Sequence, residues 1–371
     1  MDPADFSALH HWVLWAGFGL AFAFGAIAQA THFCTMGAVS DVVNIGDWSR
    51  ARQWVLAIGV AMIGFAVLGL TGLIRPADAL YATPRLSWLS TAVGGLMFGL
   101  GMVFSSGCGN KTLIRVGTGN LKAWVVFAVM GISAFATLRG ITAVLRNSTV
   151  DQVYLDLEPS ASLGHWVSIA LGLDPVQGAG WVGLLLGAVL CAWVLRHKDF
   201  WTATNLWAGL GCGGIVVAMW WLTGHVGFVE EHPQTLEQVY VATNSGRMES
   251  LSFVAPMAYV LDWLMFYSDK SKVLTLGVMI ALGVIVGSFV SSLFTGTFRW
   301  EGFGGVDDLG HHLIGAVLMG VGGVTALGCT IGQGLSGMST LALNAFVALA
   351  FIVMGALVGF KYQIWRLERQ V

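Results

Sequence analysis

The sequence predicts an all-α, polytopic integral membrane protein with about nine transmembrane helices, broken or re-entrant segments and pseudo-symmetric internal repeats. Its composition supports this prediction in two ways. Of its 371 residues, 56% are hydrophobic and only 10% are charged, whereas soluble domains are about 25% charged. Glycine occurs 50 times, nearly double its usual share of about 7%. Small residues let membrane helices approach closely and let the backbone leave helical geometry.

Nine apolar runs are candidates for the transmembrane helices, since a span needs about 20 apolar residues, or fewer where a segment is broken. They cover residues 12–33, 53–73, 89–107, 121–138, 180–195, 200–222, 273–296, 313–328 and 340–360. A tenth run, 251–267, contains Pro256 and Asp262, which favour an interfacial or buried helix. We expect a single membrane domain, residues 1–371. Its parts are a first repeat half at about 12–140, connecting segments at about 141–270 and a second half at about 271–360.

The distribution of Lys and Arg predicts the topology, because cytoplasmic loops carry an excess of both. The tail contains Lys361, Arg366 and Arg369, which places the C-terminus in the cytoplasm. Nine spans then place the N-terminus outside. No Lys or Arg precedes Arg50, so the first apolar run lacks the basic region of a cleavable signal peptide and is expected to remain as a span. The net charge of −2 argues against nucleic acid as a partner.

An internal repeat joins two glycine-rich blocks with the pattern G-x4-G-x-G-x5-G-C. Alignment of Cys108 with Cys329 also aligns four pairs of glycines: Gly94 with Gly315, Gly99 with Gly320, Gly101 with Gly322 and Gly107 with Gly328. The predicted spans run the two blocks in opposite directions, which is the signature of an inverted repeat with a site near the membrane midplane. A weaker match sets Gly25 against Gly287 and Cys34 against Gly296, but there both segments run the same way.

Three cysteines occupy glycine-flanked breaks in very apolar segments. Their surroundings are His-Phe-Cys34-Thr-Met-Gly, Ser-Gly-Cys108-Gly-Asn-Lys and Leu-Gly-Cys329-Thr-Ile-Gly-Gln-Gly. A soft thiol at membrane depth, on backbone that does not readily stay helical, indicates a site for a sulfur-like ligand. The other two cysteines, Cys191 and Cys212, lie inside apolar runs and are expected to act as small hydrophobic residues. The sequence has no C-x-x-C motif, so a zinc or thioredoxin-like site is not indicated.

Neighbours of these cysteines complete the candidate site for a soft anion. They are Gly107, Gly109, Gly328, Lys111, Thr330 and Gln333. Glycine lets the chain leave helical geometry, and a helix that begins just after a cysteine directs unpaired N–H groups, which attract anions, toward the break. Lys111 could attract an anion at the inner mouth or serve only as an inside-positive topology residue. Gln333 could hydrogen-bond an oxyanion or make a polar contact between helices.

Other interpretations of these residues stay open. Any single cysteine can simply be a small apolar residue of a membrane helix. A Cys108–Cys329 disulfide would occlude a path between the repeats, and a metal ion could bind the three cysteines together with His32. His311 and His312, which lie beside two aspartates, could relay protons or form a solvated helix start.

The sequence contains none of the common enzyme motifs. It has no G-x-S-x-G, no H-E-x-x-H and no phosphate-binding loop. We therefore predict a protein that is not an enzyme, with no catalytic residues, no cofactor, no resident metal and no ATP drive within the chain.

In its glycine–cysteine blocks the chain resembles the YeeE/YedE family of bacterial sulfur-transport membrane proteins. The resemblance rests on Phe33-Cys34 after a glycine-rich span, on the block 94–111 and on the block 315–334. It covers about 12–140 and 270–360, and the intervening residues are less distinctive.

The resemblance implies an hourglass-shaped, all-helical, multi-pass protein of the bacterial inner membrane with pseudo-symmetric halves. In such a membrane the Lys and Arg distribution places the N-terminus in the periplasm and the C-terminus in the cytoplasm. It implies import of thiosulfate or a related sulfur anion, passed between Cys34, Cys108 and Cys329 through S–H···S contacts rather than covalent bonds. Cys34 would receive the ion near one constriction, and the other two would continue the relay. The implied partners are the anion, the lipid bilayer and a separate soluble sulfur carrier of the TusA type.

A rival interpretation is a membrane thiol enzyme, similar to a sulfurtransferase, that forms a persulfide. Such an enzyme needs an activated thiolate and a resolving thiol.

Overall fold

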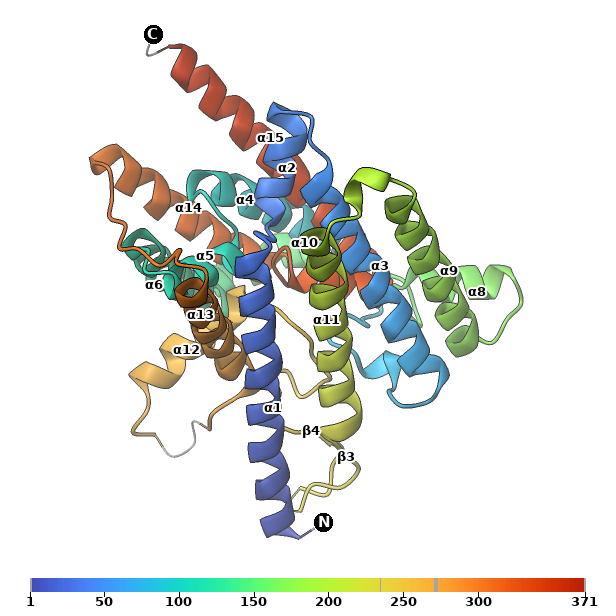
Figure 1. Ribbon diagram of the computed structural model, residues 1–371. Helices are drawn as coiled ribbons and strands as arrows, with labels where there is room; N and C mark the ends of the chain where they lie inside the picture. Colours follow the sequence, from blue (N-terminus) through green and yellow to red (C-terminus); the bar gives the residue numbers. More distant parts are fainter. Residues whose placement is uncertain (1, 234, 270–272, 370–371) are drawn as a thin grey trace.

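The computed structural model describes residues 2–233, 235–269 and 273–369. It is a bundle of helices whose two termini lie at opposite ends (Figure 1), which we call the N-terminal side and the C-terminal side. The α-helices are α1 (Pro3–Ala30), α2 (Thr35–Asn44), α3 (Ser49–Leu70), α4 (Trp88–Phe104), α5 (Gly109–Gly117), α6 (Leu121–Arg139), α7 (Ile141–Ser148), α8 (Leu163–Ala170), α9 (Pro175–Leu195), α10 (Ala203–Leu206), α11 (Cys212–Trp221), α12 (Val254–Met265), α13 (Leu276–Phe294), α14 (Val306–Thr325) and α15 (Leu343–Glu368). Loops contain two antiparallel strand pairs, β1 (Arg85–Leu86) with β2 (Leu155–Asp156) and β3 (Phe228–Val229) with β4 (Val239–Tyr240).

Eight helical segments of the described chain are long and apolar enough to cross a membrane. They cover residues 4–44, 49–70, 88–117, 121–139, 175–195, 203–226, 276–294 and 343–366. The ninth predicted run, 313–328, lies largely in α14, whose first two turns carry two aspartates and two histidines that shorten its apolar part. The run 251–267 forms the short apolar helix α12. The predicted all-α polytopic fold is confirmed.

Each of the candidate cysteines interrupts a helical segment. Cys34 separates α1 from α2, Cys108 separates α4 from α5, and Cys329 lies between α14 and the π-helix η6 (Gly332–Gly337). The first two interruptions fall inside segments that are long enough to span a membrane. They are therefore the broken helices that the sequence predicts.

Helices α4 and α14, which carry the two glycine-rich blocks, pack against each other in opposite directions. A Cβ at Gly94 would lie 2.7 Å from the carbonyl oxygen of Gly322, and a Cβ at Gly101 would lie 2.6 Å from that of Gly315. The repeat aligns Gly94 with Gly315 and Gly101 with Gly322, so these two contacts are copies of each other about a pseudo-twofold axis. This geometry is that of an inverted repeat, and only glycine permits such a close backbone approach.

Helices α1 and α13 are parallel neighbours and do not follow the same inverted relationship. The Phe22 carbonyl lies against Gly287, and the Ser291 hydroxyl donates to the Ala26 carbonyl at 3.2 Å. From the first contact to the second, the residue number rises by four in each helix, so the two helices run in the same direction. The weaker match of Gly25 with Gly287 therefore marks a packing contact between parallel helices.

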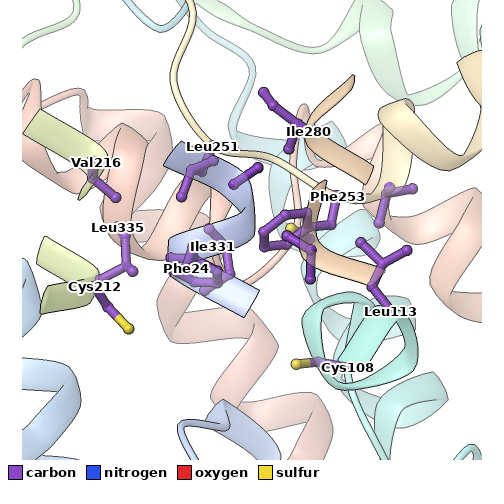
Figure 2. Packing of buried hydrophobic residues seen from close by; sticks show 14 of the residues in the cluster. Phe24, Cys108, Leu113, Cys212, Val216, Leu251, Phe253, Ile280, Ile331 and Leu335 are labelled. Carbon is purple, nitrogen blue, oxygen red and sulfur yellow. The ribbon is translucent and has the colours of Figure 1, made fainter. Parts of the chain in front are cut away.

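An apolar core fills the space between the helices. Figure 2 shows Cys212 on α11 among these residues. Cys212 is fully buried in this core, and Cys191 on α9 packs against Gly59 of α3. Both positions are consistent with the packing role expected for these two cysteines.

Candidate functional site

The chain breaks in the same way before Cys34, Cys108 and Cys329. In each case a helix ends, a residue adopts left-handed backbone, one further residue follows, and the cysteine comes next. The left-handed residues are His32 (φ 55°), Ser106 (φ 53°) and Leu327 (φ 57°). The residue after each donates its N–H to a carbonyl five positions back: Phe33 to Ala28 at 3.1 Å, Gly107 to Met102 at 2.9 Å and Gly328 to Gly323 at 2.8 Å. These are three Schellman helix endings, which turn the chain sharply and satisfy the last carbonyls.

The same turn also closes α13, where it carries no cysteine. Gly296 is the left-handed residue (φ 66°), and Thr297 donates its N–H to the Ser292 carbonyl at 2.9 Å. By position in the turn, Gly296 corresponds to His32, so Phe298 stands where Cys34 stands. The sequence match of Cys34 with Gly296 was displaced by two residues.

Each cysteine begins a helical turn whose first N–H groups point at its sulfur. Cys34 is the N-cap of α2. Cys108 is the N-cap of α5, as expected from the sequence. Gly332 donates its N–H to the Cys329 sulfur at 3.4 Å. The N–H groups of Met36 and Gly37 lie near the Cys34 sulfur, and that of Lys111 lies near the Cys108 sulfur. Three helix starts therefore converge on sulfur, and helix N-termini favour negative charge.

The three breaks meet inside the molecule. The Cys34 and Cys108 thiols are close neighbours. The Thr330 hydroxyl, next to Cys329 in the chain, approaches the Cys108 thiol. All five cysteines of the chain lie in its described part and are free thiols, so neither Cys34 nor Cys329 is bonded to Cys108. The structure thus brings together residues that are nearly 300 positions apart.

Several residues at or beside these breaks have a buried polar atom without a partner. The atoms are Thr35 Oγ1, Trp54 Nε1, Asn110 Oδ1, Thr330 Oγ1 and Gln333 Oε1, none of which has a hydrogen-bond partner among the described residues. Asn110 and Gln333 are fully buried. A buried polar atom left unsatisfied costs about 1–3 kcal/mol, so a group of them at or beside these breaks is typical of a site that binds a polar ligand.

Four basic side chains lie on one side of the thiols. Lys111 is near enough to Cys34 and Cys108, and to Arg115 and Arg50, to interact with them electrostatically. His32 is close to Lys111 and Arg50 in the same way. Arg50 pairs with Asp41 at 3.1 Å. The Lys111 ammonium is therefore a positive charge beside the Cys34–Cys108 pair, as a site for an anion requires.

A cavity of about 270 Å³ lies beside Cys329, and none of these four basic residues lines it. Gly328 and Gln333 line it, together with Tyr81 and Ser252 from two loops. Tyr81 is also close enough to Cys329 to interact with it electrostatically. A Cβ at Gly332 would lie 2.8 Å from Ser252 Oγ and 3.1 Å from Tyr81 Oη, so this glycine leaves room for both side chains.

The predicted glycines differ in what the structure requires of them. A Cβ at Gly107 would lie 3.1 Å from the Lys111 side chain, and one at Gly328 would lie 3.1 Å from Cγ of Gln333. A Cβ at Gly109 would lie no closer than 3.7 Å to any neighbouring atom. Gly107 and Gly328 therefore allow neighbouring side chains to approach closely, whereas a Cβ at Gly109 would make ordinary van der Waals contacts.

Sequence reasoning missed several residues of the site. Asn110 donates to the Phe33 carbonyl at 3.4 Å and links α5 to the Cys34 break. Trp54 stacks on Phe33 with ring centroids 4.8 Å apart. Asn110 lies between Gly109 and Lys111, two predicted site residues, and this position in the sequence could have identified it as part of the site. Trp54 and Tyr81 are single aromatic residues in unremarkable segments, and no pattern distinguished them.

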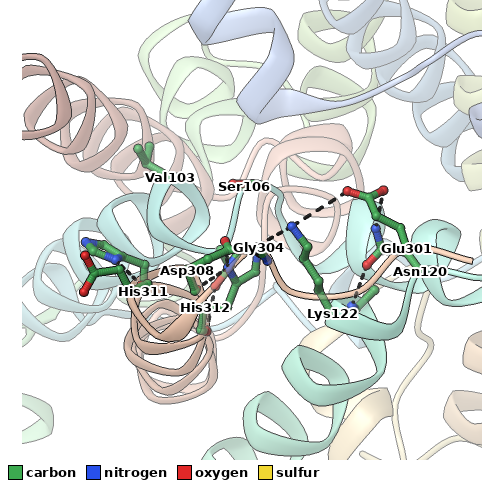
Figure 3. A network of polar contacts seen from close by, with 12 residues as sticks. Val103, Ser106, Asn120, Lys122, Glu301, Gly304, Asp308, His311 and His312 are labelled. Atoms are coloured by element: carbon green, nitrogen blue, oxygen red, sulfur yellow. Dashed lines mark hydrogen bonds and ion pairs between the residues drawn. The ribbon is translucent and has the colours of Figure 1, made fainter. Parts of the chain in front are cut away.

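The two histidines of α14 belong to a polar network on the C-terminal side (Figure 3). His312 is buried, and its Nδ1 lies 3.0 Å from Asp308 Oδ1. Lys122 at the start of α6 pairs with Asp308 at 2.9 Å and with Glu301 at 3.8 Å. The network joins the starts of α6 and α14. This arrangement favours a structural role for the two histidines at the start of α14.

The chain is similar to proteins of known name over nearly its whole length. The model of a family described as "Sulphur transport" (Sulf_transp) matches residues 30–358. A protein of Spirochaeta thermophila named thiosulfate transporter TsuA is 28% identical over 353 residues, which cover 92% of this chain and 97% of that protein. A protein of Escherichia coli K12 with the same name is 26% identical over 339 residues, which cover 89% of each.

Proposed function

The chain belongs to the sulphur-transport family of membrane proteins, as its glycine–cysteine blocks predicted, and on that basis we propose that it imports thiosulfate or a closely related sulfur anion across a bacterial inner membrane. The relatives over about nine-tenths of the chain are named as thiosulfate transporters. Their names, like the family's, describe transport and not catalysis, and the chain is a transport protein rather than an enzyme.

The meeting of three equivalent helix breaks, each with a thiol, carries the proposal of a cysteine relay. Thiosulfate has a soft terminal sulfur and an oxyanion end. The thiols of Cys34, Cys108 and Cys329 are suited to the sulfur, which they contact without forming a bond. Backbone N–H groups at the helix starts and the side chains of Thr330 and Gln333 are suited to the oxyanion. Weak sites in series favour passage, because tight binding would block exit.

The two sides of the site support an order along this path. In this order the anion enters through the cavity beside Cys329. Gly328 and Gln333 line that cavity, so it gives access to the proposed binding residues at this cysteine. The ion then passes Thr330 and Cys108 and reaches Cys34, beside the basic residues. This order reverses the expectation that Cys34 receives the ion. With the C-terminus in the cytoplasm, as the basic tail favours, the cavity faces the periplasm and the direction is import.

A separate soluble sulfur carrier of the TusA type is the partner we propose on the cytoplasmic side. An anion released near Lys111 would have to be consumed there to sustain uptake.

Uptake of labelled thiosulfate into proteoliposomes tests the proposal. We expect saturable uptake that unlabelled thiosulfate abolishes and that sulfate reduces little, because sulfate lacks the soft terminal sulfur. Sulfite and sulfide serve as further competitors. Equal competition by sulfate would contradict a thiol relay, and the absence of uptake would contradict transport.

Mass spectrometry after exposure to thiosulfate separates the relay from persulfide chemistry. Unmodified Cys34, Cys108 and Cys329 are expected. A stable adduct of one sulfur atom on any of them would instead favour the enzyme.

A further inference from the structure

A carboxylate lines the cavity through which the sulfur anion is proposed to enter. Glu249 lies in the loop before α12, is partly buried, and shares the cavity with Tyr81, Gln333 and Gly328. It is therefore on the path to Cys329. A fixed negative charge there opposes the anion that the path is proposed to admit, and the sequence offers no reason for it.

The groups that face Glu249 do not neutralise it. Its Oε1 accepts a hydrogen bond from the Ser245 N–H at 2.7 Å. A neutral amide oxygen could accept the same hydrogen bond. Tyr81 and Tyr259 are near enough for their phenols to interact with it electrostatically. Arg146, from α7, also lines the cavity but pairs with Asp151 at 2.9 Å.

Two further charged residues near Glu249 are engaged elsewhere. In the segment that packs against 248–249, Asp78 accepts a hydrogen bond from the Tyr240 hydroxyl at 2.7 Å. Arg247, two positions before Glu249, donates to the Ala82 carbonyl at 3.3 Å. Among the described residues, then, no ion pair joins Glu249 to a cation.

Burial raises the pKa of the Glu249 carboxyl, and hydrogen bonds from the Ser245 region only partly offset this. The carboxyl therefore holds its proton to a higher pH than an exposed glutamate does. A dianion in the same cavity raises its proton affinity further. Two unit charges about 6 Å apart repel strongly enough to lower occupancy on the order of a hundredfold at an effective dielectric constant of about 20.

We propose that Glu249 is a proton-binding site, and that a sulfur anion occupies the outer cavity together with a proton on this carboxyl. The proposal rests on the proposed function, because it needs an anion in the cavity. Proton and anion then favour each other's binding reciprocally. The neutral carboxylic acid can also donate its hydrogen to an anion oxygen, which the carboxylate cannot do.

The membrane potential gives this pairing a consequence for uptake. An inside-negative potential of 100 mV opposes a dianion by a concentration ratio on the order of a thousandfold. A proton that binds with the anion reduces the charge that must enter the conduit. Uptake should therefore be faster at lower external pH.

Calorimetric titration of the purified full-length protein with thiosulfate tests the proposal. Titration in two buffers of different ionisation enthalpy measures the protons taken up with each anion. For the wild-type protein we expect uptake of up to one proton, and an affinity that weakens by up to about tenfold per pH unit as pH rises through the carboxyl pKa. For Glu249→Gln we expect no proton uptake and an affinity that does not vary with pH.

Two further variants control for folding and for surface charge. Glu249→Asp keeps a titratable carboxyl and should keep proton uptake with a shifted midpoint. Glu231→Gln removes an exposed carboxylate that does not line the cavity and should behave as wild type. Wild-type binding without proton uptake would overturn the proposal while leaving transport intact. Unchanged proton uptake in Glu249→Gln would also overturn the proposal, because another group, such as His32, would then bind the proton. Absence of thiosulfate binding at every pH would instead overturn the proposed function.

Discussion

The two inverted repeats end their first helices alike, at Cys108 and at Cys329, but differ three residues further on. The first repeat has Lys111, whose ammonium lies beside Cys34 and Cys108. The second has Gly332, which leaves space for Tyr81 and Ser252 at the cavity. One pseudo-symmetric frame therefore has a positive charge beside one cysteine and a cavity beside the other.

A second difference lies in the helix that follows each cysteine. The first repeat continues as the α-helix α5 and reaches its next left-handed residue at Gly119. The second continues as the π-helix η6, and the matching left-handed residue, Leu341, comes one position later than the repeat predicts. A π-turn is a one-residue insertion that is often found at functional sites. The two repeats thus share one backbone arrangement, and the local differences between them make the two ends of the proposed path unlike.

The strongest test of this comparison removes the thiol from either repeat. Cys108→Ala or Cys329→Ala should abolish thiosulfate-dependent growth of a strain that lacks other importers, because the ion loses a contact in the relay. Cys212→Ala, at an equally buried cysteine outside the path, should leave growth unchanged. Normal growth of both relay variants, with the protein present in the membrane, would refute the relay.

Filling the space at Gly332 should act on the second repeat alone. Gly332→Leu would place side-chain atoms against Tyr81 and Ser252 and obstruct the cavity, so we expect uptake to fall by about tenfold or more. Gly214→Leu is the matched control, because no atom lies within 4 Å of a Cβ there. Uptake and thermal unfolding are measured for both, and a Gly332→Leu protein that transports normally would show that the cavity is not on the path.

Removing the charge of the first repeat should have a smaller effect. Lys111→Met keeps most of the volume but removes the ammonium beside the thiols. About 1–2 kcal/mol of electrostatic attraction at partial burial corresponds to uptake about tenfold slower at low substrate. Lys361→Met removes an exposed charge on α15 and should have little effect. If the rates of the two variants at several salt concentrations coincide, Lys111 is only a topology residue.

The smallest effect is expected where the two repeats touch through Thr330. Thr330→Val keeps the shape and removes the hydroxyl that is proposed to bind the oxyanion. The loss of one hydrogen bond to the anion, about 0.5–1.5 kcal/mol, should weaken thiosulfate binding a few-fold. Thr112→Val is the control of equal size, since the Thr112 hydroxyl bonds within its own helix to the Cys108 carbonyl at 3.1 Å. Equal affinity of the two variants would remove Thr330 from the site.

The sequence predicted those parts of the fold that depend on spacing along the chain. The glycines at 94, 101, 315 and 322 are spaced so that one alignment pairs them, and the same spacing brings them together as backbone contacts. The start of α5 after Cys108 also followed, because glycine and a following polar segment mark a helix boundary.

The rest depends on contacts between segments that no repeat relates. Nothing in the sequence around Cys34 indicates that its thiol reaches Cys108, because that contact arises where the Cys34 break packs against α5, through the hydrogen bond from Asn110 to the Phe33 carbonyl. Tyr81 comes to the cavity from one loop, and Glu249 and Ser252 come to it from another. The sequence did not predict the π-turn of η6, because the aligned glycines of the second block end at Gly328, before η6 begins.

The reciprocal glycine contact between α4 and α14 also has a consequence for how the protein is made. Gly94 leaves the ribosome about 230 residues before Gly322, the residue it packs against. At typical synthesis rates of 5–20 residues per second this interval is on the order of 10 to 50 s. During it the grooved face of α4 is covered by lipid or by an insertion chaperone, so nascent chains truncated before α14 should be recognised and degraded as orphaned helices.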